Sequence, residues 1–173
     1  MSLVTISNLQ RITASKLADM LLGATRSGAV DSESKIAVVD VRDDDHIGGH
    51  IKSSLHFPSR SLDATMPTLL RRLADADTVV FHCALSQQRG PSAALRYLRA
   101  RERAEAKQQP VQEGGEQEKN KGKDEHEGAE NEGAAVPQKV YVLDRGFVGW
   151  QELYGLDERL TEAYRREIWE DGY

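Results

Sequence analysis

Short runs of apolar residues alternate along this chain with stretches of helical periodicity, and this alternation is the feature that most restricts its fold. Three segments, residues 36–40, 78–82 and 139–143, each contain a continuous apolar run rich in valine, which is typical of strands buried on both faces. Helical patterns separate and follow them. The alternation predicts an α/β fold: a three-layer domain with a mainly parallel central sheet of about five strands and helices on both faces.

Two shorter extended segments, residues 11–12 and 54–57, complete the predicted sheet. Thr13 or Ser15 is a suitable N-cap for the first helix, and Pro67 is compatible with the first turn of the second. The predicted helices span residues 14–22, 67–73, 92–101, 148–154 and 157–169.

The whole net charge of −5 falls within one segment. Residues 102–138 hold ten acidic and five basic side chains, so the remainder of the chain is neutral. This segment has no aromatic residue and few aliphatic ones, so it cannot bury enough apolar surface to offset the chain entropy lost on folding. We predict a single domain over residues 1–173 with a disordered acidic insert at about residues 105–137, a solvated spacer being favoured over an acidic docking segment.

Composition excludes several classes of function. The neutral remainder offers no basic surface for nucleic acid, and no apolar run approaches the ~20 residues that span a membrane. The N-terminus lacks the pattern of a signal peptide, so we expect a cytoplasmic or nuclear protein. A single cysteine excludes an internal disulfide and a cysteine-built metal site. His46 and His50 lie four residues apart but lack the glutamate of the H-E-x-x-H motif, so a zinc site is not expected. We also expect no other metal and no cofactor.

The segment H-C-A-L-S-Q-Q-R-G-P, residues 82–91, carries the predicted chemistry. It follows a buried strand and leads into a helix, and its Cys83 and Arg89 are spaced as C-x5-R. Such a loop directs successive backbone N–H groups into one concavity, and the following helix adds the N–H groups of its first turn. Arg89 can hold two oxygens of a tetrahedral oxyanion, while all these donors favour the thiolate of Cys83. A thiolate beneath a phosphorus atom is an in-line nucleophile.

The residues of this loop also have structural interpretations. A lone cysteine after an apolar strand most often packs in a core, and it is the spacing to Arg89 that favours anion binding at Cys83. His82 is expected to orient the loop by hydrogen bonds rather than to act as an acid or base. The Ser86 hydroxyl can bind the thiolate or complete the loop backbone, and the sequence leaves both open. The predicted oxyanion-binding residues are Ala84, Leu85, Ser86, Gln87, Gln88 and Arg89.

Three motifs occur in the order found in rhodanese-like domains. D-V-R-D at residues 40–43, followed by G-G-H-I-K-S-S at residues 48–54, resembles the rhodanese pattern D-x-R-x…G-H-I-x-G-A. The H-C-x5-R loop comes next, and D-R-G-F-V-G-W at residues 144–150 resembles the closing G-G-F-x-x-W signature. The resemblance covers about residues 10–155 without the insert, and it implies the rhodanese-like fold. It also implies residues that lock the loops around the site: Asp40, Arg42 and His50.

Loop length separates chemistries within that fold. Sulfurtransferases resembling rhodanese have a shorter loop, whereas M-phase inducer dual-specificity phosphatases and fungal-type arsenate reductases share H-C-x-x-S-x-x-R-G-P with this chain. M-phase inducer phosphatases have a glutamate, a proposed proton donor, where this chain has Gln88, and arsenate reductases have a non-acidic residue there. The general acid is therefore unassigned. The candidates are acids in loops and nothing more: Asp43, Asp44, Asp45 and Asp63.

The residues and the resemblance together predict a hydrolase: a cysteine-dependent phosphatase of the protein tyrosine and dual-specificity type that forms a thiophosphate on Cys83. Aromatic residues make up only 6% of the chain, which indicates a shallow site for a phosphorylated protein or a small oxyanion. The alternative is arsenate reduction, with glutathione or glutaredoxin as external thiol because the chain has no second cysteine. A non-catalytic module that binds a phosphorylated partner is the third hypothesis.

Overall fold

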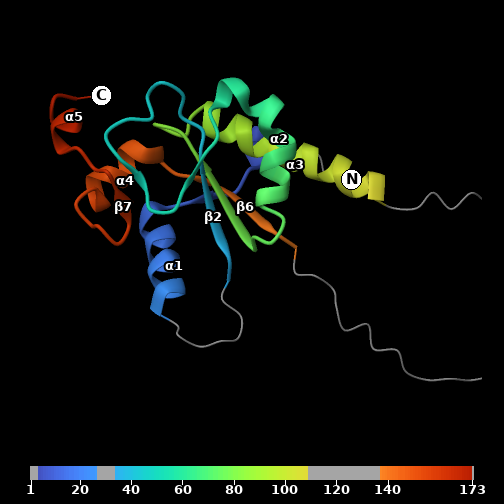
Figure 1. Ribbon diagram of the computed structural model, residues 1–173, viewed down its shortest axis with the longest axis horizontal. Coiled ribbons are helices and arrows are strands. Elements are labelled where there is room, and N and C mark those ends of the chain that lie inside the picture. The colour runs from blue at the N-terminus through green and yellow to red at the C-terminus, as the bar shows by residue number, and fades with distance from the viewer. Residues whose placement is uncertain (1–3, 27–33, 109–136, 173) are drawn as a thin grey trace, which may run out of the picture.

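Five strands form one parallel sheet in the structure, a computed structural model that describes residues 4–26, 34–108 and 137–172 (Figure 1). Their order across the sheet is β1-β6-β5-β2-β4, and every neighbouring pair runs parallel. The strands are β1 (Arg11–Ile12), β2 (Ile36–Asp40), β4 (Leu55–His56), β5 (Thr78–His82) and β6 (Lys139–Leu143). The α/β class and the parallel sheet predicted from the apolar runs are confirmed.

Side chains of the central strands alternate between the two faces of the sheet. Val38 and Val80 belong to one core, whereas Val39, Val79 and Phe81 belong to the other. The strand register preserves this separation, because Val38 pairs with Val80 and Val39 with Phe81. Both faces are apolar and both need cover, which explains why the runs are continuously apolar.

Helices cover both faces of the sheet, as Figure 1 shows. One core joins the sheet to α2 (Leu62–Arg72) and α3 (Arg89–Gln108). The other core joins it to α1 (Ala14–Arg26) and α4 (Gly146–Tyr154). The predicted three layers are therefore present, and the loop between β5 and α3 begins at the carboxyl end of the central strand β5.

Two predicted helix starts are resolved by local contacts. The Thr13 hydroxyl accepts the N–H of Lys16 at 3.2 Å, so Thr13 rather than Ser15 is the N-cap of α1. A 3-10 turn, η2 (Ser59–Ser61), leads directly into α2, so Pro67 lies inside that helix and not in its first turn. Because proline has no N–H, α2 lacks one backbone hydrogen bond at this position.

The segment after α4 differs most from the prediction, which placed one helix over residues 157–169. It contains instead a short strand, β7 (Thr161–Glu162), and a short helix, α5 (Arg166–Glu170). β7 pairs antiparallel with β3 (His50–Ile51), a strand that the sequence did not indicate. Helical periodicity is a local pattern, and here pairing with a strand more than a hundred residues away overrides it.

α3 continues to Gln108, so the first four residues of the predicted insert, 105–108, are helical. An ion pair between Arg101 and Glu105, one turn apart and 3.5 Å long, supports this end of the helix. Residues 109–136 lie outside the described residues, so the disorder of the insert stays a prediction. Neither α3 nor any other helix in the described ranges is long and apolar enough to cross a membrane.

Candidate active site

The carboxyl ends of β2 and β5 bring the two predicted strand-end residues together. Asp40 pairs in register with His82 on the neighbouring strand. The N–H of Val41 then donates to the His82 carbonyl at 2.9 Å, which keeps the two chains together one residue further. The loop that contains Cys83 therefore begins beside the loop that follows Asp40, at the edge where parallel α/β sheets bind ligands.

Cys83 lies at the base of the loop between β5 and α3, with 4% of its surface exposed. Its Sγ accepts a hydrogen bond from the backbone N–H of Ser86 at 3.2 Å. Ser86 adopts the left-handed region, with a φ of 53°, to make this contact. The Ser86 hydroxyl is buried and has no hydrogen-bond partner among the residues described, so it is the backbone of Ser86 that contacts the sulfur.

The first turn of α4 fixes two carbonyl groups of the loop. The N–H of Phe147 donates to the carbonyl of Cys83 at 2.9 Å. The N–H of Val148 donates to the carbonyl of Ala84, also at 2.9 Å. A trans peptide holds its C=O and N–H on opposite sides, so the N–H groups of Ala84 and Leu85 point away from α4.

Gly146 allows α4 to approach the loop this closely. Its φ is 55°, and a Cβ at this position would lie 2.5 Å from the carbonyl oxygens of both Cys83 and Ala84. Any other residue would therefore displace either the helix or the loop. The glycine of the D-R-G-F motif thus has a mechanical role in this chain, because it lets the helix amides reach the loop carbonyls.

Arg11 of β1 fixes a third carbonyl of the loop. Its Nη1 and Nη2 both donate to the carbonyl of Ser86 at 3.2 Å. The N–H of Gln87 belongs to the same peptide, so it points away from Arg11. Sequence reasoning missed this contact, because Arg11 and Ser86 are 75 residues apart and no motif links them.

The loop and the start of α3 surround a hollow of about 330 Å³. Cys83 lines it, and of the six residues predicted to bind an oxyanion only Ser86 does not. The others that line it are Ala84, Leu85, Gln87, Gln88 and Arg89. A sulfur, several backbone amides and a guanidinium thus meet in one place, which is the chemistry of an oxyanion site.

Arg89 engages two carboxylates of the loop that follows β2. Its Nη1 and Nη2 donate to the two oxygens of Asp45 at 2.7 and 2.6 Å. Nη1 also donates to Asp43 at 3.3 Å. The hydrogen bonds to Asp45 raise the pKa of Arg89 against the opposing effect of burial, and the charge of Asp45 and the hydrogen bond to Asp43 raise it further, so the guanidinium stays charged. From the sequence these carboxylates were acids in a loop and nothing more.

Asp40 and Arg42 form a fully buried ion pair beneath this acidic loop. Arg42 Nη2 donates to Asp40 Oδ2 at 2.7 Å and to the carbonyl of Gly49 at 2.8 Å. Its guanidinium also lies 4.2 Å from the centre of the Phe147 ring. Burial alone would raise the pKa of Asp40, but His82 and the hydrogen bonds and charge of Arg42 lower it to about 2. The pair therefore ties the loop after β2 to α4.

His82 is fully buried behind Cys83. Its Nδ1 lies 3.0 Å from the Cys83 carbonyl oxygen, and because a carbonyl only accepts, Nδ1 carries the proton. Its Nε2 lies 3.7 Å from a carboxylate oxygen of Asp40. Burial lowers the pKa of His82 against the opposing charge of Asp40, so the ring is neutral at pH 7. Its contact is with the loop backbone, which fits an orienting role better than acid–base chemistry.

The predicted supporting residue His50 does not line the hollow. Its Nε2 lies 3.0 Å from the carboxylate of Glu162, a contact between β3 and β7. His46 stacks on His56 with ring centroids 3.8 Å apart, and burial lowers the pKa of His46 to about 4. Within the described ranges, no group of three or more ligating side chains could hold a metal ion.

The two remaining loop acids lie on the surface and pair with arginines. Asp44 is bound by Arg60 at 3.0 Å, and Asp63 is bound by Arg96 at 3.0 Å. None of the four acids considered from the sequence is among the described residues that line the hollow. The general acid therefore stays unassigned.

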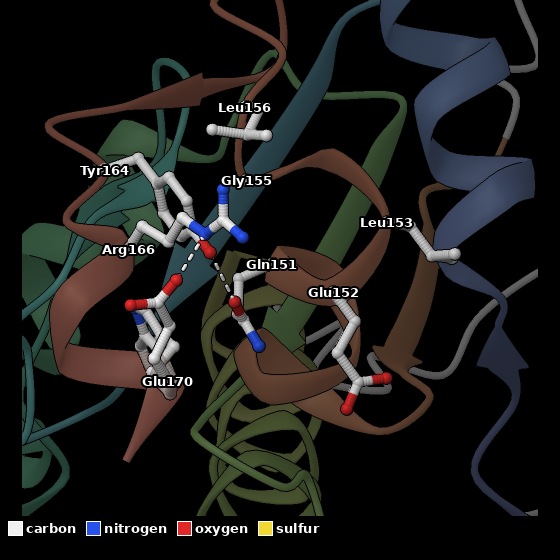
Figure 2. A pocket seen from close by; sticks show the side chains of 9 residues that line it. Gln151, Glu152, Leu153, Gly155, Leu156, Tyr164, Arg166 and Glu170 are labelled. Carbon is white, nitrogen blue, oxygen red and sulfur yellow. Dashed lines mark hydrogen bonds and ion pairs between the residues drawn. The ribbon is translucent and has the colours of Figure 1, made fainter. Parts of the chain in front are cut away.

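A second hollow, also of about 330 Å³, lies between α4 and the C-terminal segment (Figure 2). Its polar side chains pair with one another: Tyr164 donates to Gln151 at 2.7 Å, and Arg166 binds Glu170 at 2.6 Å. No residue predicted for the site lines it. The reactive groups therefore belong to the hollow at Cys83.

The parallel sheet, the C-x5-R loop at the end of β5 and the two flanking motifs define a rhodanese-like domain. The rhodanese-like domain family matches residues 25–153, and the chain belongs to this family. A CDC25-like phosphatase of Saccharomyces cerevisiae, YCH1, is 36% identical over 143 residues, which cover 76% of each chain. Arsenate reductase 2.1 of Oryza sativa subsp. japonica is 39% identical over 124 residues, which cover 69% of this chain and 59% of the reductase.

Solved structures similar to this chain also include a relative of the Cdc25 phosphatases and a reductase. Ygr203w of Saccharomyces cerevisiae, a homolog of single-domain rhodanese and the Cdc25 phosphatase catalytic domain, superimposes with a TM-score of 0.66 and 29% identity, over 98% of this chain and 97% of that one. The As-Sb reductase of Leishmania major gives a TM-score of 0.61 and 25% identity, over 89% and 85%. The predicted family is confirmed, and its similar members include both chemistries considered from the sequence.

Proposed function

We propose that this protein is a cysteine-dependent phosphatase of the tyrosine and dual-specificity type. The observation that carries the proposal is the environment of Cys83, whose Sγ accepts the N–H of Ser86 and shares one hollow with the guanidinium of Arg89. A phosphoryl group is complementary to this arrangement, with phosphorus facing the sulfur and its oxygens facing the donors. The relatives named as phosphatases support it.

In the first step the thiolate of Cys83 attacks phosphorus opposite the leaving oxygen. The S–P bond forms while the P–O bond to the leaving group breaks, and the leaving group departs with that electron pair. The N–H groups of Ala84, Leu85 and Gln87, together with Arg89, stabilise the other three oxygens. A water molecule then attacks phosphorus, the S–P bond breaks, and phosphate and the thiolate are released. The scheme uses no metal or cofactor.

An aryl phosphate is the substrate class that this site favours, with phosphotyrosine on a protein of the cytoplasm or nucleus as the biological form. No carboxylic acid is among the described residues that line the hollow, and Gln88 has no titrating proton to donate. A phenolate leaves more easily than an alkoxide and depends less on a general acid. The absence of such an acid therefore favours tyrosine over serine or threonine phosphates.

Hydrolysis of p-nitrophenyl phosphate tests the proposal. We expect turnover by the purified protein and none by Cys83→Ser, because the hydroxyl is a far weaker nucleophile than the thiolate. Circular dichroism and thermal unfolding of Cys83→Ser should match the parent, so that loss of activity reflects the sulfur. Turnover that survives this substitution would refute the mechanism.

Arsenate reduction is the second candidate, and Gln88 is the observation that favours it, because a non-acidic residue at this position resembles the arsenate reductases. The thiolate of Cys83 attacks arsenic, the S–As bond forms, and an arsenate oxygen leaves as water. Glutathione then attacks the sulfur of Cys83: the S–As bond breaks, its electron pair reduces As(V) to As(III), and a mixed disulfide forms. A further thiol, glutathione or glutaredoxin, reduces that disulfide.

Two further results would select one of the alternatives to the phosphatase. Consumption of arsenate that depends on glutathione and glutaredoxin, without hydrolysis of p-nitrophenyl phosphate, selects the reductase. Protection of Cys83 from iodoacetamide by phosphate, with neither reaction, selects a module that binds a phosphorylated partner.

A further inference from the structure

The contact between Arg89 and the loop after β2 uses only part of the guanidinium. Asp45 accepts one hydrogen bond from Nη1 at 2.7 Å and one from Nη2 at 2.6 Å, at the outer end of the guanidinium. Asp43 accepts a hydrogen bond from Nη1 at 3.3 Å. A guanidinium carries five N–H donors in a rigid fork, so three are engaged.

The two remaining donors lie on one edge. They are the Nε–H and the second hydrogen of Nη2, and neither has an acceptor within the ranges that the structure describes. These two hydrogens are parallel, and parallel N–H pairs bind two oxygens of a phosphate or arsenate at once. Arg89 therefore keeps one bidentate edge for a ligand while the rest of the group is held.

The holding carboxylates are themselves fixed. Asp43 accepts from the hydroxyl of Ser59 at 2.6 Å and from the N–H of Arg60 at 3.0 Å. Asp45 accepts from the N–H of Asp43 at 3.0 Å, which sets its carboxylate within the turn. A side chain with four rotatable bonds, Arg89, is thus clamped by a rigid turn before any ligand arrives.

The charges around Arg89 indicate that this clamp does more than set the affinity for an oxyanion. Asp43, Asp45 and Arg89 together carry a net negative charge, and this charge repels an incoming dianion. If the two acids only competed with the substrate for Arg89, they would weaken oxyanion binding without any gain in catalysis. The same acids strengthen the site when alignment of Arg89 in the transition state outweighs the repulsion.

We propose that Asp45, supported by Asp43, is a positioning residue that clamps the outer end of Arg89 and leaves its Nε–Nη2 edge for the oxyanion. The inference rests on the proposed function for its catalytic readout, and on oxyanion binding alone for its second readout. It predicts a split between the two: removing the negative charge of Asp45 slows turnover while ground-state binding of an oxyanion changes less.

The test compares Asp45→Asn with a matched variant, Asp44→Asn. Both remove one charge from the same turn, but Asp44 is 90% exposed at its side chain and contacts Arg60 rather than Arg89. We expect kcat for p-nitrophenyl phosphate to fall roughly 10- to 100-fold in Asp45→Asn and to stay within about two-fold in Asp44→Asn. Asp45→Glu, which retains the carboxylate, should recover part of the loss.

Binding is measured independently, as the phosphate concentration that halves the rate at which iodoacetamide modifies Cys83. In Asp45→Asn this concentration should change by less than kcat does. An unchanged or higher kcat together with tighter phosphate binding would overturn the proposal, because Asp45 would then only compete for Arg89. An equal fall in Asp44→Asn would overturn it as well. If phosphate protects Cys83 of the parent but the parent shows no turnover, the proposed phosphatase fails. The clamp is then judged from binding alone. It is refuted if the half-protecting phosphate concentration is several-fold lower in Asp45→Asn, and it is supported if that concentration is unchanged or higher.

Discussion

Two loops meet at the candidate active site, and they are held by different forces. The loop of Cys83 is held through its backbone: amides of α4 bind the carbonyls of Cys83 and Ala84, and the N–H of Ser86 binds the sulfur. The loop after β2 is held through charged side chains, with the Asp40–Arg42 pair beneath it. Backbone contacts tolerate many side chains but few changes of shape, whereas ion pairs tolerate small changes of shape but no change of charge.

Asp40→Asn should have the largest effect on stability, because it breaks the side-chain-held loop at its base. It leaves the fully buried Arg42 without its counter-charge, and such a loss costs about 3–5 kcal/mol. Urea denaturation measures the change in the free energy of unfolding. Asp44→Asn, on the surface of the same loop, should stay within about 0.5 kcal/mol. A similar small value for Asp40→Asn would show that the pair does not hold this loop.

Gly146→Ala should act on the backbone-held loop through shape alone. The new Cβ meets the carbonyl oxygens of Cys83 and Ala84 and also occupies a left-handed conformation, so we expect a loss of about 1–3 kcal/mol. Displacement of the loop amides should lower kcat for p-nitrophenyl phosphate by roughly 100-fold.

Gly23→Ala is the matched control for Gly146→Ala. A Cβ at Gly23, in α1, has no atom within 4 Å, and alanine is favoured by about 1 kcal/mol in a helix. Normal activity in Gly146→Ala would contradict the mechanical role of this glycine.

A smaller effect should appear on acidification, because each loop has a histidine whose pKa is lowered: His46 lies in the loop after β2, and His82 contacts the loop of Cys83. Burial lowers the pKa of His46 from 6.5 to about 4, and it also lowers that of His82. The unfolded chain then takes up protons first as the pH falls. The stabilisation by the neutral rings is complete above about pH 6.5 and is lost as the pH falls towards 4.

His46→Phe keeps an aromatic ring to stack on His56 and removes one titrating group. The melting temperature of this variant should fall less between pH 7 and pH 4.5 than that of the parent. An identical fall in both proteins would assign the pH dependence to His82 or to other groups. Asp40, with its pKa near 2, adds its own loss of stability only below about pH 4.

Much of the fold was predictable from local pattern. The strands at residues 36–40, 78–82 and 139–143 have the predicted bounds, because a buried parallel strand is a continuous apolar run. The helix predicted over residues 157–169 was wrong, because its periodicity did not reveal that Thr161 pairs with Ile51. β3 itself was missed, since two residues are too few to show a period.

The site divides in the same way. Cys83 and Arg89 were found from their spacing, and the structure brings both to one hollow. His50 was expected from the family resemblance to lock the loops around the site, and in the structure its Nε2 contacts Glu162 of β7. Arg11 was not considered, and Asp45 was considered only as one of four loop acids, although Arg11 contacts Ser86 and Asp45 contacts Arg89.

The order of residues determined the alternation of strand and helix and the presence of a cysteine and an arginine at the two ends of one short loop. These features depend on neighbours within about ten positions, where periodicity and spacing are informative. Tertiary structure alone decided what holds the loop. Arg11 reaches Ser86 across 75 positions and Asp45 reaches Arg89 across 44, and such contacts exist only because the strand order places β1, β2 and β5 in one sheet.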